Sequence, residues 1–403
     1  MKKMSLCAGL LLASAVASAA LAGCGARETS ASAMWNGTID TLASGRIVVS
    51  NPATGIWDET TAWSVVEELR IGTLDDIGPD MFGSIDELEV DAWGRFWVFE
   101  GQAQELRVFD RDGAHVRTIG REGGGPGEFA RVIGISLAPD GNLWTVDPSN
   151  ARISIIDTAG NYVGSHGTVG GWMIMPWPGG VDVEGRFWNF APDVSSAEPN
   201  IVMIAYDHDL NPLDTVPVPE YPGEGEYFEL RTERGHMMTN VPFTPGLEWR
   251  FDMRGYMWFM LTGDYSITQL SLEGDTLRTI TRDFEPLPVT GADIDSAMVG
   301  MEWFIENGGK VDASRIPGHK PATDEFLFDD EGNIWVLPVT TLAEEDRVVD
   351  VFDPEGRYLG RLRLPFQLST NPPPVFRDGF MYGVTEDELE VPYLIRARIE
   401  KPM

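Results

Sequence analysis

A short motif, glycine, any residue, an apolar residue and then tryptophan or tyrosine, recurs six times along these 403 residues. The aromatic residues of the six copies are Trp97, Trp144, Trp188, Trp258, Trp335 and Tyr382. The glycine can open a strand through a tight turn, and the aromatic side chain can pack between neighbouring sheets. One such unit cannot bury its own apolar face, so the series indicates a modular β architecture.

The spacing of the copies predicts where the architecture departs from regularity. The motif glycines are 47, 44, 70, 77 and 47 residues apart. The short intervals fit a four-stranded propeller blade, and the long ones predict insertions at about 219–248 and 290–322. Residues 292–307 have apolar side chains near helical spacing, with Gly308 and Gly309 as a stop. We therefore expect a short amphipathic helix that lies over one face of the ring.

Three stretches carry a family resemblance: residues 90–98 (Val-Asp-Ala-Trp-Gly-Arg-Phe-Trp-Val), 106–113 and 120–129. The last contains Gly-x-Gly-Pro-Gly-x-Phe, which we interpret as a link between blades, because it lacks the Lys-Ser/Thr and the helix of a phosphate loop. On these residues the chain resembles the NHL-type six-bladed β-propellers, in particular their bacterial lipoprotein branch. The resemblance is closest over about 85–167, and it implies an all-β ring of six four-stranded blades.

The ring needs a device for closure. Residues 393–401 stop one strand short of a complete blade, whereas 63–72 read as an isolated outer strand. We expect residues 65–71 to complete the last blade, so that the propeller comprises 63–403 and leaves no exposed sheet edge. Residues 45–50 lack the aromatic of the motif. We predict an accessory strand or hairpin there, and a seventh blade is the alternative.

The N-terminus has the pattern of an export signal. Two lysines, an apolar stretch over 6–21 and then Leu-Ala-Gly before Cys24 resemble a bacterial lipoprotein signal peptide spanning 1–23. The resemblance implies that Cys24 is acylated, and that 24–62 form a lipidated tether with the accessory strand. An ordinary signal peptide with an incidental cysteine is the alternative. We expect a lipid-anchored protein of the bacterial cell envelope, on the periplasmic side or at the cell surface.

Charge and cysteine content limit the partners. The formal net charge of −33 repels polyanions, so we expect no nucleic acid, and membrane contact only through the N-terminal lipid. The two cysteines, Cys7 and Cys24, lie within the signal and at its end, so the exported body has no disulfide. We expect a monomer stabilised by packing alone.

Catalytic patterns are sparse. The five histidines form no metal-binding pair, and neither a Gly-x-Ser-x-Gly elbow nor a cysteine nucleophile is present after processing. The Asp-x-Asp-Gly at 110–113 resembles a calcium loop only superficially, and hairpin turn chemistry explains it. We predict no catalytic residue, no metal site and no cofactor.

The two insertions concentrate cationic and aromatic residues on an acidic chain, and we predict a ligand-binding surface where they meet. The candidates are Tyr227, Phe228, Arg231, Arg234, Trp303, Arg315, His319 and Lys320. The alternative is that these cations pair with local carboxylates and hold the insertions down.

These patterns together favour a lipid-anchored extracytoplasmic propeller that binds an unidentified protein or small-molecule ligand. The alternative is a propeller enzyme of lactonase or lyase type that acts through a channel metal or histidine, because fold alone does not decide function.

Overall fold

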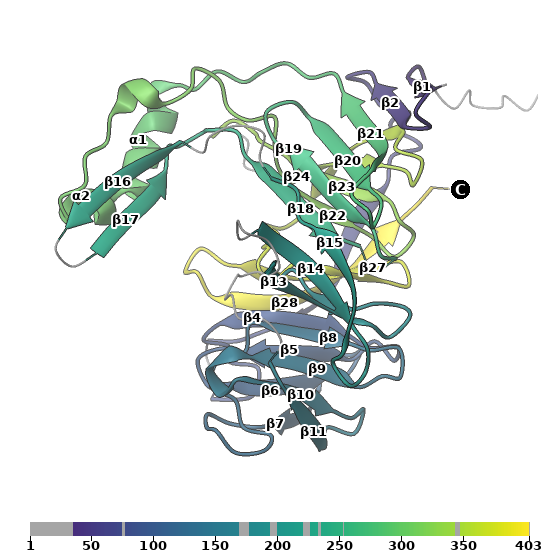
Figure 1. The fold of residues 1–403 in the computed structure, drawn as a ribbon, viewed down its shortest axis with the longest axis vertical. Coiled ribbons are helices and arrows are strands. Elements are labelled where there is room, and N and C mark those ends of the chain that lie inside the picture. Colours follow the sequence, from purple (N-terminus) through teal and green to yellow (C-terminus); the bar gives the residue numbers. More distant parts are fainter. Residues whose placement is uncertain are drawn as a thin grey trace, which may run out of the picture.

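The computed structural model describes residues 35–74, 77–168, 177–193, 200–220, 226–232, 235–252, 254–342 and 347–402. The predicted signal peptide and Cys24 lie outside these residues. Six antiparallel sheets form the blades of a propeller around a central axis (Figure 1). The predicted all-β, six-bladed fold is confirmed.

The strands of each blade follow one another from the axis outward. In this order they are β4 (Ile85–Val90), β5 (Phe96–Glu100), β6 (Glu105–Phe109) and β7 (His115–Ile119) in blade 1; β8 (Gly134–Leu137), β9 (Leu143–Asp147), β10 (Arg152–Ile156) and β11 (Tyr162–Gly167) in blade 2; β12 (Gly180–Val181), β13 (Phe187–Asp193), β14 (Asn200–Tyr206) and β15 (Pro212–Pro217) in blade 3; β18 (Leu247–Phe251), β19 (Met257–Leu261), β20 (Ser266–Leu270) and β21 (Thr276–Arg282) in blade 4; β22 (Thr323–Phe328), β23 (Ile334–Pro338), β24 (Arg347–Phe352) and β25 (Tyr358–Leu364) in blade 5; and β26 (Val375–Arg377), β27 (Phe380–Glu386), β28 (Pro392–Glu400) and β3 (Ser64–Ile71) in blade 6.

The repeated motif does what its residue types predict. All six motif glycines have positive φ, between 76° and 95°, in the turn from the first to the second strand of a blade. The aromatic side chain that follows is buried in every blade. In four blades an aspartate stands three residues before the glycine and accepts a hydrogen bond from the indole of the tryptophan, as from Trp188 Nε1 to Asp182 at 2.8 Å. The same aspartates accept backbone N–H groups, so one side chain fixes both the turn and the tryptophan.

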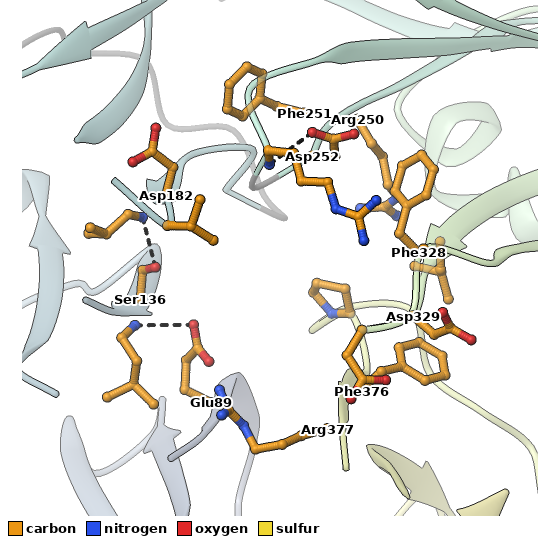
Figure 2. A pocket seen from close by; sticks show the side chains of 18 of the residues that line it. Glu89, Ser136, Asp182, Arg250, Phe251, Asp252, Phe328, Asp329, Phe376 and Arg377 are labelled. Atoms are coloured by element: carbon orange, nitrogen blue, oxygen red, sulfur yellow. Dashed lines mark hydrogen bonds between the residues drawn. The ribbon is translucent and has the colours of Figure 1, made fainter. Parts of the chain in front are cut away.

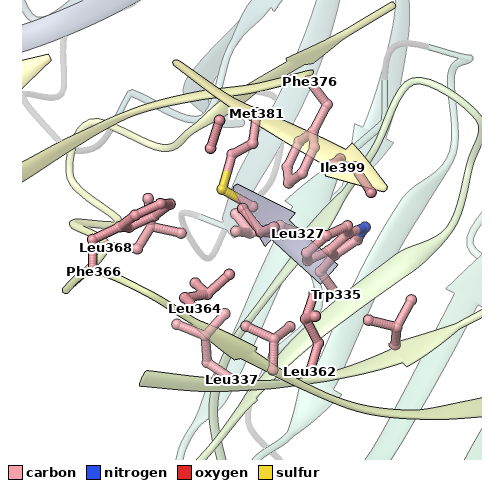
Figure 3. Packing of buried hydrophobic residues seen from close by; sticks show 14 of the residues in the cluster. Leu327, Trp335, Leu337, Leu362, Leu364, Phe366, Leu368, Phe376, Met381 and Ile399 are labelled. Atoms are coloured by element: carbon pink, nitrogen blue, oxygen red, sulfur yellow. The ribbon is translucent and has the colours of Figure 1, made fainter. Parts of the chain in front are cut away.

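The N-terminal strand closes the ring as predicted. β3 pairs with β28 over the whole of its length, from Ser64 opposite Glu400 to Ile71 opposite Leu394. Its Val65 belongs to the apolar cluster between blades 5 and 6, where Trp335 and Phe376 have ring centroids 5.1 Å apart (Figure 3). Pairing of β3 with β28 removes the free edge that β28 would otherwise expose.

Residues 45–50 form part of an accessory hairpin and not a seventh blade. β1 (Thr38–Thr41) and β2 (Ile47–Asn51) pair with each other, and β2 extends blade 4 by a parallel pairing with β21. Asn51 anchors the hairpin, because its side chain accepts from the Trp35 indole at 2.9 Å and from the Tyr358 backbone at 2.7 Å.

The two insertions pack on each other and form an arm that projects from the ring (Figure 1). The first is the hairpin β16 (Tyr227–Thr232) and β17 (Gly235–Asn240). The second contains the predicted helix as two helices, α1 (Gly291–Gly300) and α2 (Glu302–Glu306), and a short turn η2 (Ala313–Arg315). The helices pack on the hairpin and not over a face of the ring, because their buried residues meet those of the hairpin.

Candidate functional site

The innermost strands hold neighbouring blades together along the axis. Glu89 of β4 accepts from the Leu137 backbone at 3.3 Å, and Ser136 of β8 accepts from the Val181 backbone at 2.9 Å. Arg250 of β18 donates to a backbone carbonyl of blade 5 at 2.5 Å. Each of the three residues stands eight positions before the aromatic of its own motif. The innermost strand of a blade has no neighbouring strand on its axial side, so its backbone groups there need other partners. The three side chains supply those partners from the preceding blade.

A cavity of about 960 Å³ lies along this axis, and all six blades contribute to its lining. Residues of the turns between first and second strands line it, including Trp93, Val183 and Tyr256, whose exposed fractions are 61%, 70% and 37%. In an antiparallel four-stranded blade these turns lie on the face opposite the links between blades. Both insertions are such links, because they follow β15 and β21. The cavity mouth and the arm therefore lie on opposite faces of the ring.

The cavity combines aromatic and charged side chains. Phe251, Phe328 and Phe376 line it from three blades, and Figure 2 shows Arg377 extending toward Glu89. Burial raises the pKa of Glu89 to about 7, although the hydrogen bond from Leu137 and the charge of Arg377 act in the opposite direction. Burial thus favours the protonated form of Glu89 more than in an exposed glutamate.

Two further ionisable residues lie inside the ring: Glu87 near Glu89, and Glu325 beside Arg250. Burial raises the pKa of Glu87 well above its ordinary value, and the nearby carboxylate of Glu89 adds to this. Burial lowers the pKa of Arg250 to about 10, and Arg250 forms an ion pair with Glu325 of β22. Arg250 therefore stays cationic at neutral pH.

The predicted binding residues of the two insertions meet in the arm, but two of them are buried. Phe228 is 2% exposed and packs in the core of the arm. Lys320 is 7% exposed, and its Nζ lies 2.7 Å from Asp293. Arg315 pairs with Glu226 and donates to a backbone carbonyl of the hairpin at 2.9 Å. These contacts agree with the alternative interpretation, in which the cations pair with local carboxylates and hold the insertions down.

The other predicted binding residues lie at the surface of the arm. Arg231 pairs with Glu229 of its own strand at 3.3 Å, and Arg234 lies outside the described residues. The remaining candidates, all exposed, are Tyr227, Trp303 and His319. Their binding of a ligand stays a prediction.

The enzymatic alternative named a channel histidine, and no histidine lines the axial cavity. All five histidines lie in described residues, and none of them lines the cavity. They are His115 on β7, His166 on β11, His208 after β14, His236 on β17 and His319 before β22. Within the described part of the chain, no three histidine, cysteine, aspartate or glutamate side chains are grouped so that they could hold a metal ion.

Comparisons with known proteins agree on the fold. Residues 71–165 match a family model, DUF5128, described as a 6-bladed beta-propeller. No curated protein matches the chain. None of the helices in the described ranges is long and apolar enough to cross a membrane.

Solved structures with a similar chain course have low sequence identity. One is a Bacteroides fragilis protein described as exported, with 11% identity and a TM-score of 0.49 over 88% of this chain and 100% of that chain. Another is virginiamycin B lyase from Staphylococcus aureus, with 12% identity and a TM-score of 0.44 over 84% and 99%. A gluconolactonase from Xanthomonas campestris has 14% identity and a TM-score of 0.39 over 78% and 88%.

Proposed function

We propose that this protein is an exported, lipid-anchored propeller that binds a small-molecule ligand in its axial cavity. The observation that carries the proposal is the cavity itself, whose volume of about 960 Å³ is at the upper end of the range of about 300–1,000 Å³ for small-molecule sites. Its mouth exposes Trp93, Val183 and Tyr256, and apolar side chains gathered at the rim of a concave surface are typical of a ligand site.

Export and anchoring are supported by the N-terminal sequence and its resemblance to the lipoprotein branch of NHL-type propellers. Acylation at Cys24 would leave a short polar tether before the first described residue, Trp35. Several acyl chains hold a protein on a membrane far more firmly than one. Mass spectrometry of protein extracted from membranes should find an N-terminus at Cys24 that carries lipid. An unmodified Cys24, or another N-terminus, would exclude the anchor.

Ligand binding can be tested without knowing the ligand. A panel of small molecules is screened for those that raise the Tm of the protein lacking residues 1–34. Trp93→Ala should abolish the Tm shift of the hits, because it removes an aromatic wall of the cavity mouth. The matched control is Trp303→Ala, since Trp303 is also an exposed tryptophan, 46% exposed, on the arm. Hits that are lost in Trp303→Ala and kept in Trp93→Ala would instead place the site on the arm.

A second function, catalysis by proton transfer, is favoured by one specific observation. Glu89 lines the cavity, and its pKa of about 7 suits a group that takes up and releases a proton near neutral pH. Conversion of a bound compound by the wild-type protein and not by Glu89→Gln would establish catalysis. Binding with no conversion by either protein would leave the binding function alone.

A further inference from the structure

The carboxylates that line the cavity all have hydrogen-bond donors within the protein. Seven of them line it: Glu89, Asp91, Asp140, Asp182, Asp252, Asp329 and Asp330. Each accepts at least one hydrogen bond from a neighbouring backbone N–H or side chain. Four of these are the turn aspartates that hold a tryptophan indole. The acidic groups of the cavity are therefore engaged in maintaining its wall.

The arginines of the same lining divide into two pairs. Arg250 donates to a backbone carbonyl and pairs with Glu325, and Arg278 donates to the Pro354 carbonyl at 2.6 Å. The guanidinium groups of Arg254 and Arg377 have neither a hydrogen-bond acceptor nor an ion-pair partner within the described part of the chain. The Nε of Arg377 is moreover buried without a hydrogen bond. A buried donor without an acceptor is costly, so a ligand that supplies one is favoured.

Glu89 does not fill this role for Arg377. The two side chains approach each other in Figure 2, and the charge of Arg377 acts on Glu89. No hydrogen bond or ion pair within 4.0 Å joins them, and the Glu89 carboxylate already accepts from the Leu137 backbone. The guanidinium group of Arg377 is thus free to bind an anion from solution.

From these unmatched cations we infer that the cavity binds a small organic anion. Its oxyanion group contacts a guanidinium group, that of Arg377 on blade 6 or that of Arg254 on blade 4, and its apolar or aromatic body lies against the aromatic lining, which includes Trp93, Tyr256 and Phe376. Guanidinium groups bind carboxylates and other oxyanions through parallel hydrogen bonds, which explains arginine at both positions. The inference rests on the proposed function, because it names the ligand class of the same cavity.

The acidic surface of the protein is compatible with this ligand class. At physiological ionic strength the screening length is about 8 Å, so distant surface carboxylates act weakly within the cavity. The unmatched guanidinium groups act at contact distance. The long-range negative field reduces nonspecific binding of polyanions, while the local cations select a compact anion that fits the cavity.

Two dyes with a common aromatic body test the inference. Anilinonaphthalene sulfonate is an anion, and phenylnaphthylamine has the same rings without the sulfonate. We expect the wild-type protein to bind the sulfonate at least tenfold more tightly, measured by fluorescence titration. Arg254→Gln with Arg377→Gln should weaken binding of the sulfonate at least tenfold and change binding of the neutral dye less than twofold. The control is Arg121→Gln, which alters an exposed arginine in the link between blades 1 and 2 and should change neither.

The outcomes separate the ligand class from the site. Equal affinity for the two dyes in the wild-type protein, or equal weakening of both by the arginine substitutions, would overturn the anion assignment. If the neutral dye still binds and Trp93→Ala removes it, the cavity remains the binding site. If neither dye binds, or if Trp93→Ala affects neither dye, the anion inference is wrong and the proposed site loses its support as well. Circular dichroism and the Tm of each variant show that the ring is folded.

Discussion

The ring and the arm enclose aromatic side chains by different means. In the ring, each motif aromatic packs between two blades, and in four blades an aspartate bonds its indole. The arm has one small core in which Phe228 and Val241 of the first insertion meet Met301 and Phe304 of the second. Two ion pairs accompany this core: Arg315 with Glu226 joins the insertions, and the buried pair of Lys320 with Asp293 lies within the second. The ring thus repeats one solution six times, whereas the arm depends on a single set of contacts.

The same comparison applies to the cations of the two regions. In the arm, the described arginine and lysine candidates each lie against a carboxylate, and the pair of Arg315 with Glu226 joins the two insertions. The lining of the ring cavity contains more acidic side chains than arginines. Even so, Arg254 and Arg377 lack such a partner in the described residues. A stretch of sequence that is rich in cations therefore does not show which cations lack a partner in the folded protein.

The largest expected effect comes from opening the ring. Deletion of residues 63–72 removes β3, exposes the edge of β28 and takes Val65 and Ile71 out of their clusters. We expect aggregation or loss of a cooperative thermal transition. Deletion of residues 25–34, which lie before the first described strand, is the control. Equal Tm values for the two deletions would show that β3 does not close the ring.

Truncation of one aromatic in each region should separate their stabilities. Trp335→Ala in the ring should lower the free energy of unfolding by about 3–5 kcal/mol, because the side chain is fully buried between two blades. Phe304→Ala in the arm should leave the main urea transition of the ring unchanged and increase proteolysis of the arm. A similar loss of stability from both substitutions would mean that ring and arm unfold as one unit.

The two regions should respond to pH in opposite directions. The pKa of Glu89 is about 7 in the folded ring, above its ordinary 4.5, so the folded state holds the proton more firmly. This group therefore stabilises the ring less and less as the pH rises from about 4.5 to about 7. Glu89→Gln should raise the unfolding free energy at pH 8 by about 3 kcal/mol relative to its effect at pH 4. Glu87 has a raised pKa too, so the substitution should reduce the pH dependence and not abolish it.

The arm should loosen on the acid side. The Lys320 ammonium and the Thr290 cap hold the pKa of Asp293 at about 2, below its ordinary 3.8. The stabilising contact is present above about pH 4 and is lost as the pH falls toward 2. Lys320→Met should speed amide exchange in β16 and β17 severalfold at neutral pH. Arg231→Met, which alters an exposed pair, should leave the exchange rates unchanged.

Much of the ring could be predicted because its determinants are local. Glycine before an aromatic specifies a turn and a strand, and an isolated strand at one end pairs with an incomplete blade at the other. The helix in the second insertion was recognised, but its break at Met301 and its packing on the hairpin were not. The position eight residues before each motif aromatic could have identified Glu89, Ser136 and Arg250 as axial residues, had the repeats been aligned upstream of the glycine.

The sequence by itself determined the number of blades, the closing strand and the place of both insertions, because each of them shows as a pattern within a short stretch of chain. Only the tertiary structure decided which charges have partners. Arg250 meets Glu325, and Arg315 meets Glu226, each across the interface of segments far apart in sequence. The cavity likewise exists only when six blades come together around one axis. Electrostatic pairing depends on distances of a few ångströms, and these are fixed by the folded ring and not by the order of residues.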